Sequence, residues 1–309
     1  MISPDFDAII IGGGAAGSSC ALWLKLLGFN PCIIEQRDRL GGLQNDSPYP
    51  NPWIVASPKR SGVEIAGNIH HNIIAQDIRC FLNSTVVAIE KSAAGYFEVA
   101  LHPHESLRIT APFLVIASGV KAITGGLQEA SNILIGPGHL VANYDFADKR
   151  VAVLGGGDNA FENYAFAKSK AAQLVHIYAH SIRARGQFLE QTPATDVYLG
   201  NYSVDAQRYQ VAGKSYDVIL VFYGWAPHLP FLDGFPLKKN SKGLILTQRY
   251  TAETSQPGIY AIGEVTDRAH PSCVTAMADG VVAAKALQLA LEGELAKDFI
   301  ARVNRINAT

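Results

Sequence analysis

The sequence begins with a strand, glycine turn and helix pattern that few folds accommodate. Residues 7–17 read DAIIIGGGAAG, in which an apolar run leads directly into glycines with G-x-G-x-x-G spacing, and the helix-like run ALWLKLLG follows. This order begins a βαβ unit that binds a dinucleotide, because the helix N-terminus presents free N–H groups to a pyrophosphate. Gly12 permits the tight turn, Gly14 lets the backbone approach the phosphates, and Gly17 lets the helix pack close to the strand.

The second strand ends in a residue suited to holding a ribose. The run PCIIE ends in Glu35, which lies 23 residues after Gly12. A carboxylate at this place accepts hydrogen bonds from an adenosine ribose. Gly41 and Gly42 follow in a loop that can pass close to a bound cofactor. The predicted cofactor-binding residues of this first site are Gly12, Gly14, Ala15, Ala16, Gly17, Glu35, Gln36 and Gly42.

A second glycine turn appears in the middle of the chain. KRVAVLGGGDNAFENYAF repeats strand, turn and helix, with Gly155, Gly157 and Ala160 at G-x-G-x-x-A spacing. Two such units predict two dinucleotide sites. Counting 23 residues from Gly155 leads to Tyr178, so the acid typical of an NAD site is absent. His180, Arg183 and Arg185 follow, and two interpretations stay open: these cations meet a 2′-phosphate, or they form a solvated surface.

The remaining segments predict how the two units are connected. TVVAIEKS, YFEVAL and LRITA are typical of an antiparallel meander, and FLVIASG of a buried strand ending at Gly119. Helices are predicted over 63–82 and from about 275 to 291. In the helix that follows the first glycine turn, Leu22, Trp23 and Leu26 can share an apolar face. We therefore predict an α/β fold with two Rossmann-like dinucleotide-binding domains of the three-layer ββα type, one inserted in the other. Residues 1–119 and 240–309 form the first domain, and residues 120–239 form the second.

Composition excludes several classes of function. The 309 residues are 48% hydrophobic and 17% charged, with a net charge of −1, so nothing indicates nucleic-acid binding. The N-terminus has no basic leader and no apolar run reaches the roughly 18 residues that span a bilayer, which predicts a cytoplasmic protein that does not bind membranes. The four cysteines, Cys20, Cys32, Cys80 and Cys273, are scattered, so neither a disulfide framework nor a metal site is expected.

The order of motifs resembles that of a known family. GGGAAG, Glu35, LGG, IASG, GGGDNA and GIYAIGEVTD resemble, over nearly the whole chain, the thioredoxin reductase branch of the flavoproteins with two dinucleotide-binding domains. The resemblance implies FAD in the first site, with Gly119, Gly263 and Glu264 beside it. It also implies a homodimer, and NADPH in the middle domain beside Asp158 and Asn159.

Three departures from this family change the expected function. The redox-active C-x-x-C is missing from HLVANYDFADKR, where the family carries it, so thioredoxin cannot be reduced by the usual route. The basic signature for NADPH is broken into YAHSIRARG. HPSCVTAMADG would place Cys273 and Val274 near the pyrimidine edge of the flavin. Cys273 is thus a candidate catalytic residue, and the alternative is a small buried thiol in place of alanine.

Two classes of function follow from the sequence. In the first, the protein is an FAD-dependent oxidoreductase that takes electrons from a reduced nicotinamide or from an electron-transfer protein such as ferredoxin or flavodoxin. Its acceptor is not thioredoxin. Its second site holds either NADPH, which reduces the flavin poorly, or another adenine dinucleotide such as a second FAD, and NADH reduces the flavin weakly or not at all. The residues of this second site are Gly155, Gly157, Asp158, Asn159, Ala160, Tyr178 and Arg183. In the second, the protein is a non-catalytic, nucleotide-sensing flavoprotein whose domains rotate on binding.

Overall fold

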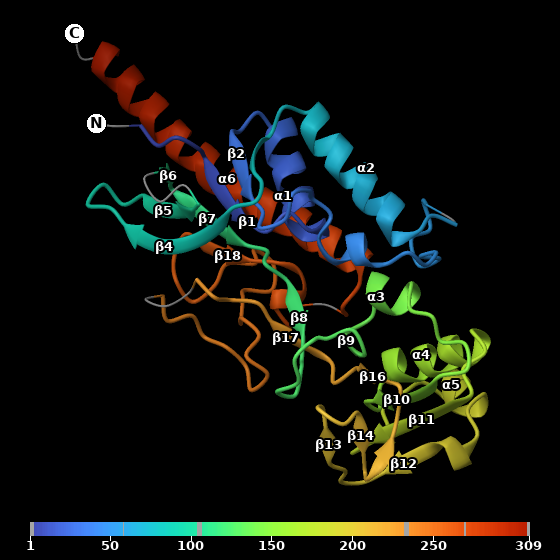
Figure 1. The fold of residues 1–309 in the computed structure, drawn as a ribbon. Coiled ribbons are helices and arrows are strands. Elements are labelled where there is room, and N and C mark those ends of the chain that lie inside the picture. Colours follow the sequence, from blue (N-terminus) through green and yellow to red (C-terminus); the bar gives the residue numbers. More distant parts are fainter. Residues whose placement is uncertain (1–2, 58, 104–106, 232–234, 269, 308–309) are drawn as a thin grey trace. The chain divides into compact units, whose positions relative to one another are not determined.

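The chain forms two compact units. The computed structural model describes residues 3–57, 59–103, 107–231, 235–268 and 270–307 (Figure 1). Unit 1 comprises Met1–Asn45, Tyr49–Val120 and Pro227–Thr309, and unit 2 comprises Asp46–Pro48 and Lys121–Ala226. The connecting strands β8 (Val120–Ala122) and β17 (Trp225–Pro227) pair with each other.

The chain returns to unit 1 earlier than the sequence predicted. The expected boundary was residue 240, but Pro227 already belongs to unit 1. The physical reason lies in the core, because Phe231 and Leu237 are buried in the same cluster as Ile9 and Ile259. The apolar residues of this irregular segment therefore fix the boundary, although they form no regular pattern.

Unit 1 is built on a parallel sheet with the order β18-β7-β1-β2-β3. Its strands are β1 (Ala8–Ile11), β2 (Pro31–Ile34), β3 (Arg79–Phe81), β7 (Phe113–Ile116) and β18 (Ile259–Ala261). The central strands are apolar at every position because both faces of the sheet are covered. All four residues of β1 and of β2 are buried.

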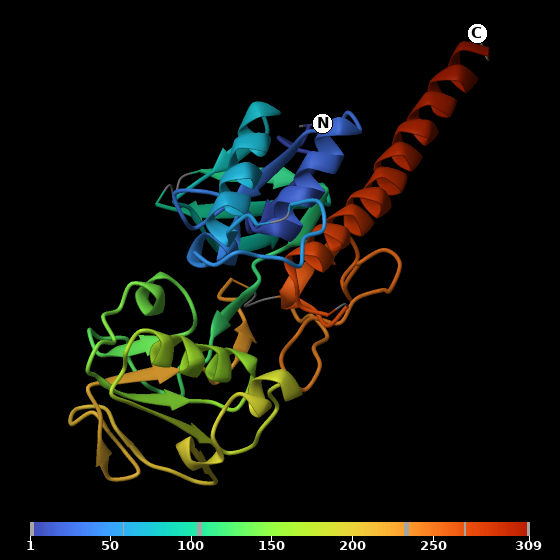
Figure 2. The same ribbon diagram turned by 90° about the vertical axis from the view of Figure 1, so that its right-hand side faces the viewer.

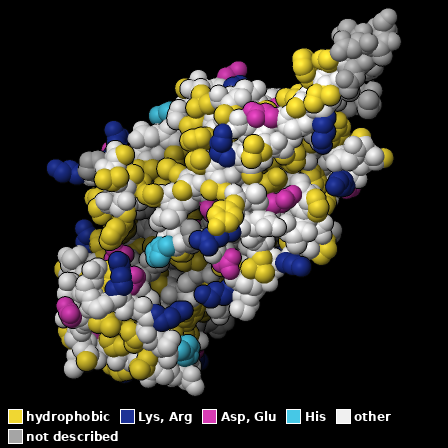
Figure 3. Space-filling view, turned by 180° about the vertical axis from the view of Figure 1, so that it is seen from behind, with side chains coloured by type: hydrophobic (Ala, Val, Ile, Leu, Met, Phe, Trp, Pro, Cys, Tyr) yellow, Lys and Arg dark blue, Asp and Glu magenta, His cyan; other side chains and the backbone are white. Residues whose placement is uncertain are grey.

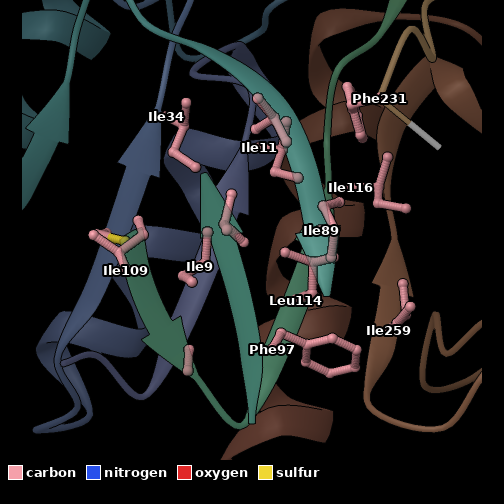
Figure 4. Packing of buried hydrophobic residues seen from close by; sticks show 14 of the residues in the cluster. Ile9, Ile11, Ile34, Ile89, Phe97, Ile109, Leu114, Ile116, Phe231 and Ile259 are labelled. Carbon is pink, nitrogen blue, oxygen red and sulfur yellow. The ribbon is translucent and has the colours of Figure 1, made fainter. Parts of the chain in front are cut away.

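Helices cover one face of this sheet and a three-stranded meander covers the other (Figure 2). Ile9 and Ile11 of β1 lie in one buried cluster with three residues of the meander, Ile89, Phe97 and Ile109 (Figure 4). Ala8 and Ile10 face the helices. The helices are α1 (Ala15–Leu26), α2 (Gly62–Ala75) and α6 (Cys273–Asn307), and the antiparallel meander is β4 (Thr85–Lys91), β5 (Phe97–His102) and β6 (Arg108–Ala111).

Two helices of unit 1 differ from the prediction. The side chains that α1 buries include Cys20 and Leu24, whereas Trp23 is 41% and Leu26 is 67% exposed. Helix α2 begins at a capping box in which Ser61 and Glu64 exchange hydrogen bonds, and it ends at Ala75 rather than 82. The residues that follow it form β3 instead, at the edge of the parallel sheet.

Helix α6 is much longer than predicted. By length and composition alone, Cys273–Lys297 would suit a membrane span, which the apolar-run criterion did not indicate. Within the structure Ala283, Ala284 and Leu287 are fully buried in the cluster that also holds α1 residues, as in the core helix of a globular domain. Farther along, apolar side chains lie at the surface (Figure 3), including Leu289, Leu295, Phe299 and Ile300.

The crossing of α1 and α6 gives a matched pair of predictions. A Cβ at Gly280 would lie 2.4 Å from the Ala16 carbonyl oxygen, whereas a Cβ at Gly293 meets nothing within 4 Å. We expect Gly280→Ala to lower the free energy of unfolding by about 1–3 kcal/mol, because the helices must separate. Gly293→Ala, in an exposed part of the same helix, should raise it by about 0.5–1 kcal/mol. Denaturant unfolding of both variants measures these changes, and equal effects would contradict the close packing.

Unit 2 repeats the architecture on a smaller scale. Its parallel sheet has the order β12-β11-β10-β16-β9, with α4 (Asp158–Ser169) packed on one face and an antiparallel meander on the other. The sheet strands are β9 (Ile133–Ile135), β10 (Arg150–Leu154), β11 (Leu174–Ala179), β12 (Val197–Leu199) and β16 (Val218–Val221). The meander consists of β13 (Val204–Asp205), β14 (Gln210–Val211) and β15 (Lys214–Ser215), and the short helices α3 (His139–Ala142), α5 (Gly186–Glu190) and η2 (Ala194–Asp196) complete the unit. The predicted fold class is confirmed.

Candidate dinucleotide-binding sites

The first glycine turn requires glycine at two positions for steric reasons. Gly12 has φ +108°, and a Cβ there would lie 2.4 Å from the Ala117 carbonyl oxygen. A Cβ at Gly17 would lie 2.0 Å from the carbonyl oxygen of Gly12. A side chain at either position would overlap one of these carbonyl oxygens. The two glycines therefore allow β1, the turn and α1 to pack this closely.

The N-terminus of α1 is suited to a phosphate. Gly14 is its N-cap residue, and the first intrahelical hydrogen bond runs from the Ser18 N–H to the Gly14 carbonyl at 2.9 Å. The N–H groups of Ala15, Ala16 and Gly17 therefore lie in the first turn, where no intrahelical acceptor exists and the helix dipole favours an anion. Gly42, with φ +56°, lies against Gly14, since a Cβ on Gly42 would be 2.9 Å from the Gly14 Cα. Gly42 begins the short helix η1 (Gly42–Asp46).

The carboxylate of Glu35 is fixed at the end of β2. It is 6% exposed, and its Oε2 accepts a hydrogen bond from the Gly13 N–H at 2.8 Å. Its Oε1 accepts one from the Arg37 N–H at 2.9 Å. The two backbone donors hold the carboxylate beside the glycine turn, where a ribose hydroxyl can donate to its remaining lone pairs. The neighbouring Gln36 is exposed.

Other predicted residues of the first site lie at the carboxyl edge of the unit 1 sheet and at the start of α6. Gly119 has φ +65° and follows β7 by three residues. Gly263 and Glu264 begin η3 (Gly263–Val265), and Gly263 follows β18 by two residues. Burial raises the pKa of the Glu264 carboxyl. A small pocket is lined by Gly263, Glu264, His270, Pro271, Ser272, Thr275, Ala276 and Asp279. The exposed side chain of Val274 is not among its lining residues.

Sequence reasoning missed a buried ion pair that supports this part of the site. Arg268 Nε lies 3.1 Å from Asp279 Oδ1, and their side chains are only 8% and 9% exposed. Asp279 Oδ2 accepts the Gly263 N–H at 3.1 Å. The Arg268 guanidinium also donates to the carbonyls of Gln248 and Arg249. The pair thus ties η3, α6 and the 247–249 segment together. The Arg and Asp eleven residues apart carried no recognisable spacing signal.

The structure argues against a redox role for Cys273. Its side chain is 9% exposed, and burial, together with the nearby Glu264 carboxyl, raises the pKa of the thiol to about 11. A reactive cysteine needs exposure and surroundings that favour the thiolate. The interpretation as a small buried residue in place of alanine therefore fits the structure better than the catalytic one.

The second glycine turn is built like the first. Gly155 has φ +137°, and a Cβ there would lie 2.3 Å from the Phe222 carbonyl oxygen. A Cβ on Gly156 would lie 1.9 Å from the Ser181 carbonyl oxygen, a constraint that the sequence analysis missed. Gly157 is the N-cap of α4, and a Cβ there meets nothing within 4 Å. Ala160 is fully buried in the core of unit 2.

The expected place of the missing acid must be moved by one residue. In unit 1 the Gly12 N–H donates to Ile34, and Glu35 follows; in unit 2 the Gly155 N–H donates to Tyr178, and Ala179 follows. A Cβ on Gly156 would lie 3.1 Å from the Cβ of Ala179, much as Gly13 lies beside Glu35. Ala179 is therefore the counterpart of Glu35, and Tyr178 is the counterpart of Ile34. The second site has no acid at this position.

Tyr178, which the sequence analysis placed in the second site, is a core residue. It is 1% exposed and stacks on Tyr198 with ring centroids 4.9 Å apart and an interplanar angle of 14°. Its hydroxyl lies 2.6 Å from that of Tyr216. A ring buried between the sheet and the meander has no face left for a ligand.

The charged residues of the second site divide into paired and open groups. Asp158, in the first turn of α4, accepts the Arg185 N–H at 2.8 Å and forms an ion pair with Arg185 Nε at 2.7 Å. The Arg183 side chain is exposed, and the described part of the chain provides it with no hydrogen bond or ion pair. Asn159 is half-buried, and its carbonyl accepts a hydrogen bond from Asn163. Among the described residues, Arg183 is therefore an arginine of this site whose side chain can meet a phosphate.

Comparison with known proteins agrees with this architecture. The sequence model of the family described as pyridine nucleotide-disulphide oxidoreductase matches residues 6–280. The chain is 28% identical over 287 residues to a ferredoxin–NADP reductase of Streptococcus suis, covering 84% of this chain and 85% of that protein. It is 28% identical over 325 residues to a ferredoxin–NADP reductase of Limosilactobacillus reuteri, covering 96% of each.

A solved structure shows the same fold. Thioredoxin reductase of Lactococcus lactis superposes with a TM-score of 0.75 over 92% of this chain and 98% of that one, at 18% sequence identity. The likeness extends over both units, so the arrangement of one dinucleotide-binding fold inserted in another is shared.

Proposed function

The chain belongs to the pyridine nucleotide-disulphide oxidoreductase family, whose members are flavin-dependent oxidoreductases, and we propose that it passes electrons between NADPH and an electron-transfer protein such as ferredoxin or flavodoxin. The proposal combines an intact flavin site with thiols that are unsuited to dithiol chemistry. Similarity to ferredoxin–NADP reductases over most of the chain supports it.

Unit 1 has the features that FAD requires. The first turn of α1 would hold the pyrophosphate, Glu35 would hold the adenosine ribose, and Glu264 would lie along the ribityl chain. FAD, when bound, supplies the electron chemistry, and the protein supplies position, dipoles and access. The buried ion pair of Arg268 and Asp279 keeps Gly263 and Glu264 in place, since Gly263 donates its N–H to Asp279.

The single observation that carries the choice of acceptor is the state of the cysteines. The chain has four, none in a C-x-x-C. Burial raises the pKa of Cys20 to about 12 and that of Cys80 and Cys273 to about 11, and it also raises the pKa of Cys32. Disulfide exchange requires a thiolate, and the raised pKa values of all four thiols disfavour that form.

The proposed electron donor follows from two residues of unit 2, Ala179 and Arg183. Ala179 replaces the carboxylate that would grip an unmodified ribose, so NAD loses a charge-assisted hydrogen bond. The exposed Arg183 favours a 2′-phosphate. These features support NADPH over NADH, and a second FAD is the alternative that the experiments below distinguish. A cytoplasmic location and a homodimer remain predictions.

The proposal predicts a clear difference between acceptors. With NADPH as donor, the holoprotein should reduce a ferredoxin or a flavodoxin and should leave thioredoxin unreduced. Cys80→Ser and Cys273→Ala should keep the ferredoxin rate, because no thiol takes part. The measurement is steady-state reduction of each acceptor under anaerobic conditions. Turnover with thioredoxin that either cysteine substitution abolishes would overturn the proposal. Nucleotide binding without any electron transfer would instead favour a sensor.

A further inference from the structure

We propose that His180 and Tyr202 form an aromatic platform that stacks on the base of the nucleotide bound by unit 2. The proposal rests on the proposed function only in taking unit 2 as a nucleotide-binding domain. From the sequence, His180 was one of three cations that could meet a phosphate, whereas in the structure its ring stacks on that of Tyr202.

The two residues come together at the carboxyl edge of the unit 2 sheet. Strands β11 and β12 are parallel and pair Ala179 with Leu199. The Gly200 N–H donates to the Ala179 carbonyl at 2.9 Å, which brings the segment after β12 alongside the segment after β11. His180 and Tyr202 lie in these two segments. Ligands of open parallel sheets bind outside the carboxyl ends of the strands.

The same segment lies directly against the glycine turn. The Gly156 carbonyl accepts hydrogen bonds from the N–H groups of Arg183 and Ala184, at 2.7 and 3.1 Å. The Ser181 carbonyl occupies the space that a Gly156 side chain would need. The residue after His180 thus contacts the turn that would hold the phosphates. A base linked to those phosphates through one ribose reaches outward from the turn over β11, toward the platform.

The ring pair has the geometry of a fixed stacking surface. The ring centroids of His180 and Tyr202 are 4.9 Å apart with an interplanar angle of 13°. His180 is exposed, so the face of its ring away from Tyr202 is open to a ligand. Tyr202 is fixed from behind, because its hydroxyl lies 3.3 Å from that of Tyr223 and its ring packs 5.5 Å from that of Tyr178. A flat ring held in this way can stack on a base with little loss of side-chain entropy.

The platform and Arg183 divide the recognition of an adenine nucleotide. Stacking selects a flat base and is tolerant of its substituents, whereas Arg183 can add charge-assisted contacts to a phosphate on the ribose. Arg185 is not available for that contact, because it neutralises Asp158 at the first turn of α4. The second site therefore binds its nucleotide by stacking and phosphate contacts, in place of the carboxylate clamp of the first site.

Calorimetric titration of the FAD-loaded protein with AMP, adenosine 2′,5′-bisphosphate and nicotinamide mononucleotide tests the platform. We expect His180→Ala to weaken AMP binding about tenfold, the loss typical of removing one aromatic partner from a base. His180→Phe, which keeps a flat ring, should bind AMP nearly as well as the wild type. Arg183→Ala should weaken the bisphosphate more than AMP. His71→Ala, an exposed histidine of α2, is the matched control and should change nothing.

Three results would overturn the platform: a wild-type protein that does not bind AMP, a His180→Ala variant with unchanged AMP affinity, or a His180→Phe variant as weak as His180→Ala. Flavin reduction by NADPH in the same preparations reports separately on the proposed function. Normal reduction with unchanged AMP binding in His180→Ala would reject the platform alone, whereas no reduction with the expected AMP affinities would reject the proposed donor alone.

Discussion

Replacing Arg268 by methionine is expected to lower the free energy of unfolding by about 3–5 kcal/mol, because it leaves the buried carboxylate of Asp279 without its cation. The guanidinium also satisfies the carbonyls of Gln248 and Arg249, so the variant loses several hydrogen bonds at once. Asp279 receives the Gly263 N–H, and we therefore expect weaker retention of FAD as well. Denaturant unfolding of the apoprotein and the FAD content after gel filtration measure the two effects.

Two controls make this result specific. Arg108→Met removes the ion pairs of Arg108 with Glu90 and Glu98, in which the side chains are 46%, 63% and 30% exposed respectively. It should cost less than about 1 kcal/mol. The double variant Arg268→Met with Asp279→Asn removes both charges and keeps an acceptor for Gly263, so it should recover part of the stability. A small effect of Arg268→Met would show that the pair is not buried in solution.

Replacing Glu35 by alanine is expected to weaken FAD binding by about tenfold or more. The loss of a charge-assisted hydrogen bond to the ribose costs roughly 1.5–3 kcal/mol, which corresponds to this factor. The substitution also leaves the N–H groups of Gly13 and Arg37 without their acceptor, so the glycine turn itself is loosened. Fluorescence titration of the apoprotein with FAD gives the affinity. Glu90→Ala, at an exposed position of β4, is the control.

Much of the fold could be predicted because it depends on local patterns that occur twice. The strand before Gly12 is apolar at each position, and the strand before Gly155 is apolar after its first residue, Arg150. The glycines have no alternative where a Cβ would overlap backbone atoms. The order of the two units along the chain followed from the same repetition. The antiparallel meander of unit 1 was visible in its alternating strands.

The errors arose where local pattern carries little information. Counting residues from Gly155 pointed to Tyr178, because the second unit has one more residue between the first glycine of its turn and the residue that accepts the N–H of that glycine. Only the pairing of Gly155 with Tyr178 reveals this shift. The early return at Pro227 depends on tertiary burial of Phe231 and Leu237. Composition cannot indicate it.

Two pairs of side chains that come from distant parts of the chain also could not be predicted. His180 and Tyr202 are separated by β12 and meet only through the parallel pairing of β11 and β12. Arg268 and Asp279 meet because η3 and the first turns of α6 are neighbours. Neither pair has a spacing that belongs to a known motif. Each pair can be recognised only in the folded chain, where it lies near the carboxyl edge of the parallel sheet of its unit.

We propose that unit 1 binds FAD and that unit 2 binds a pyridine nucleotide, and this assignment can be tested directly. Its most direct test is to denature the purified protein and to count and identify the nucleotides released per chain, followed by anaerobic flavin reduction with NADPH and NADH. We predict one FAD per chain, reduced faster by NADPH than by NADH. Two FAD per chain with no reduction by either nicotinamide, or a protein that binds no FAD on reconstitution, would contradict the claim.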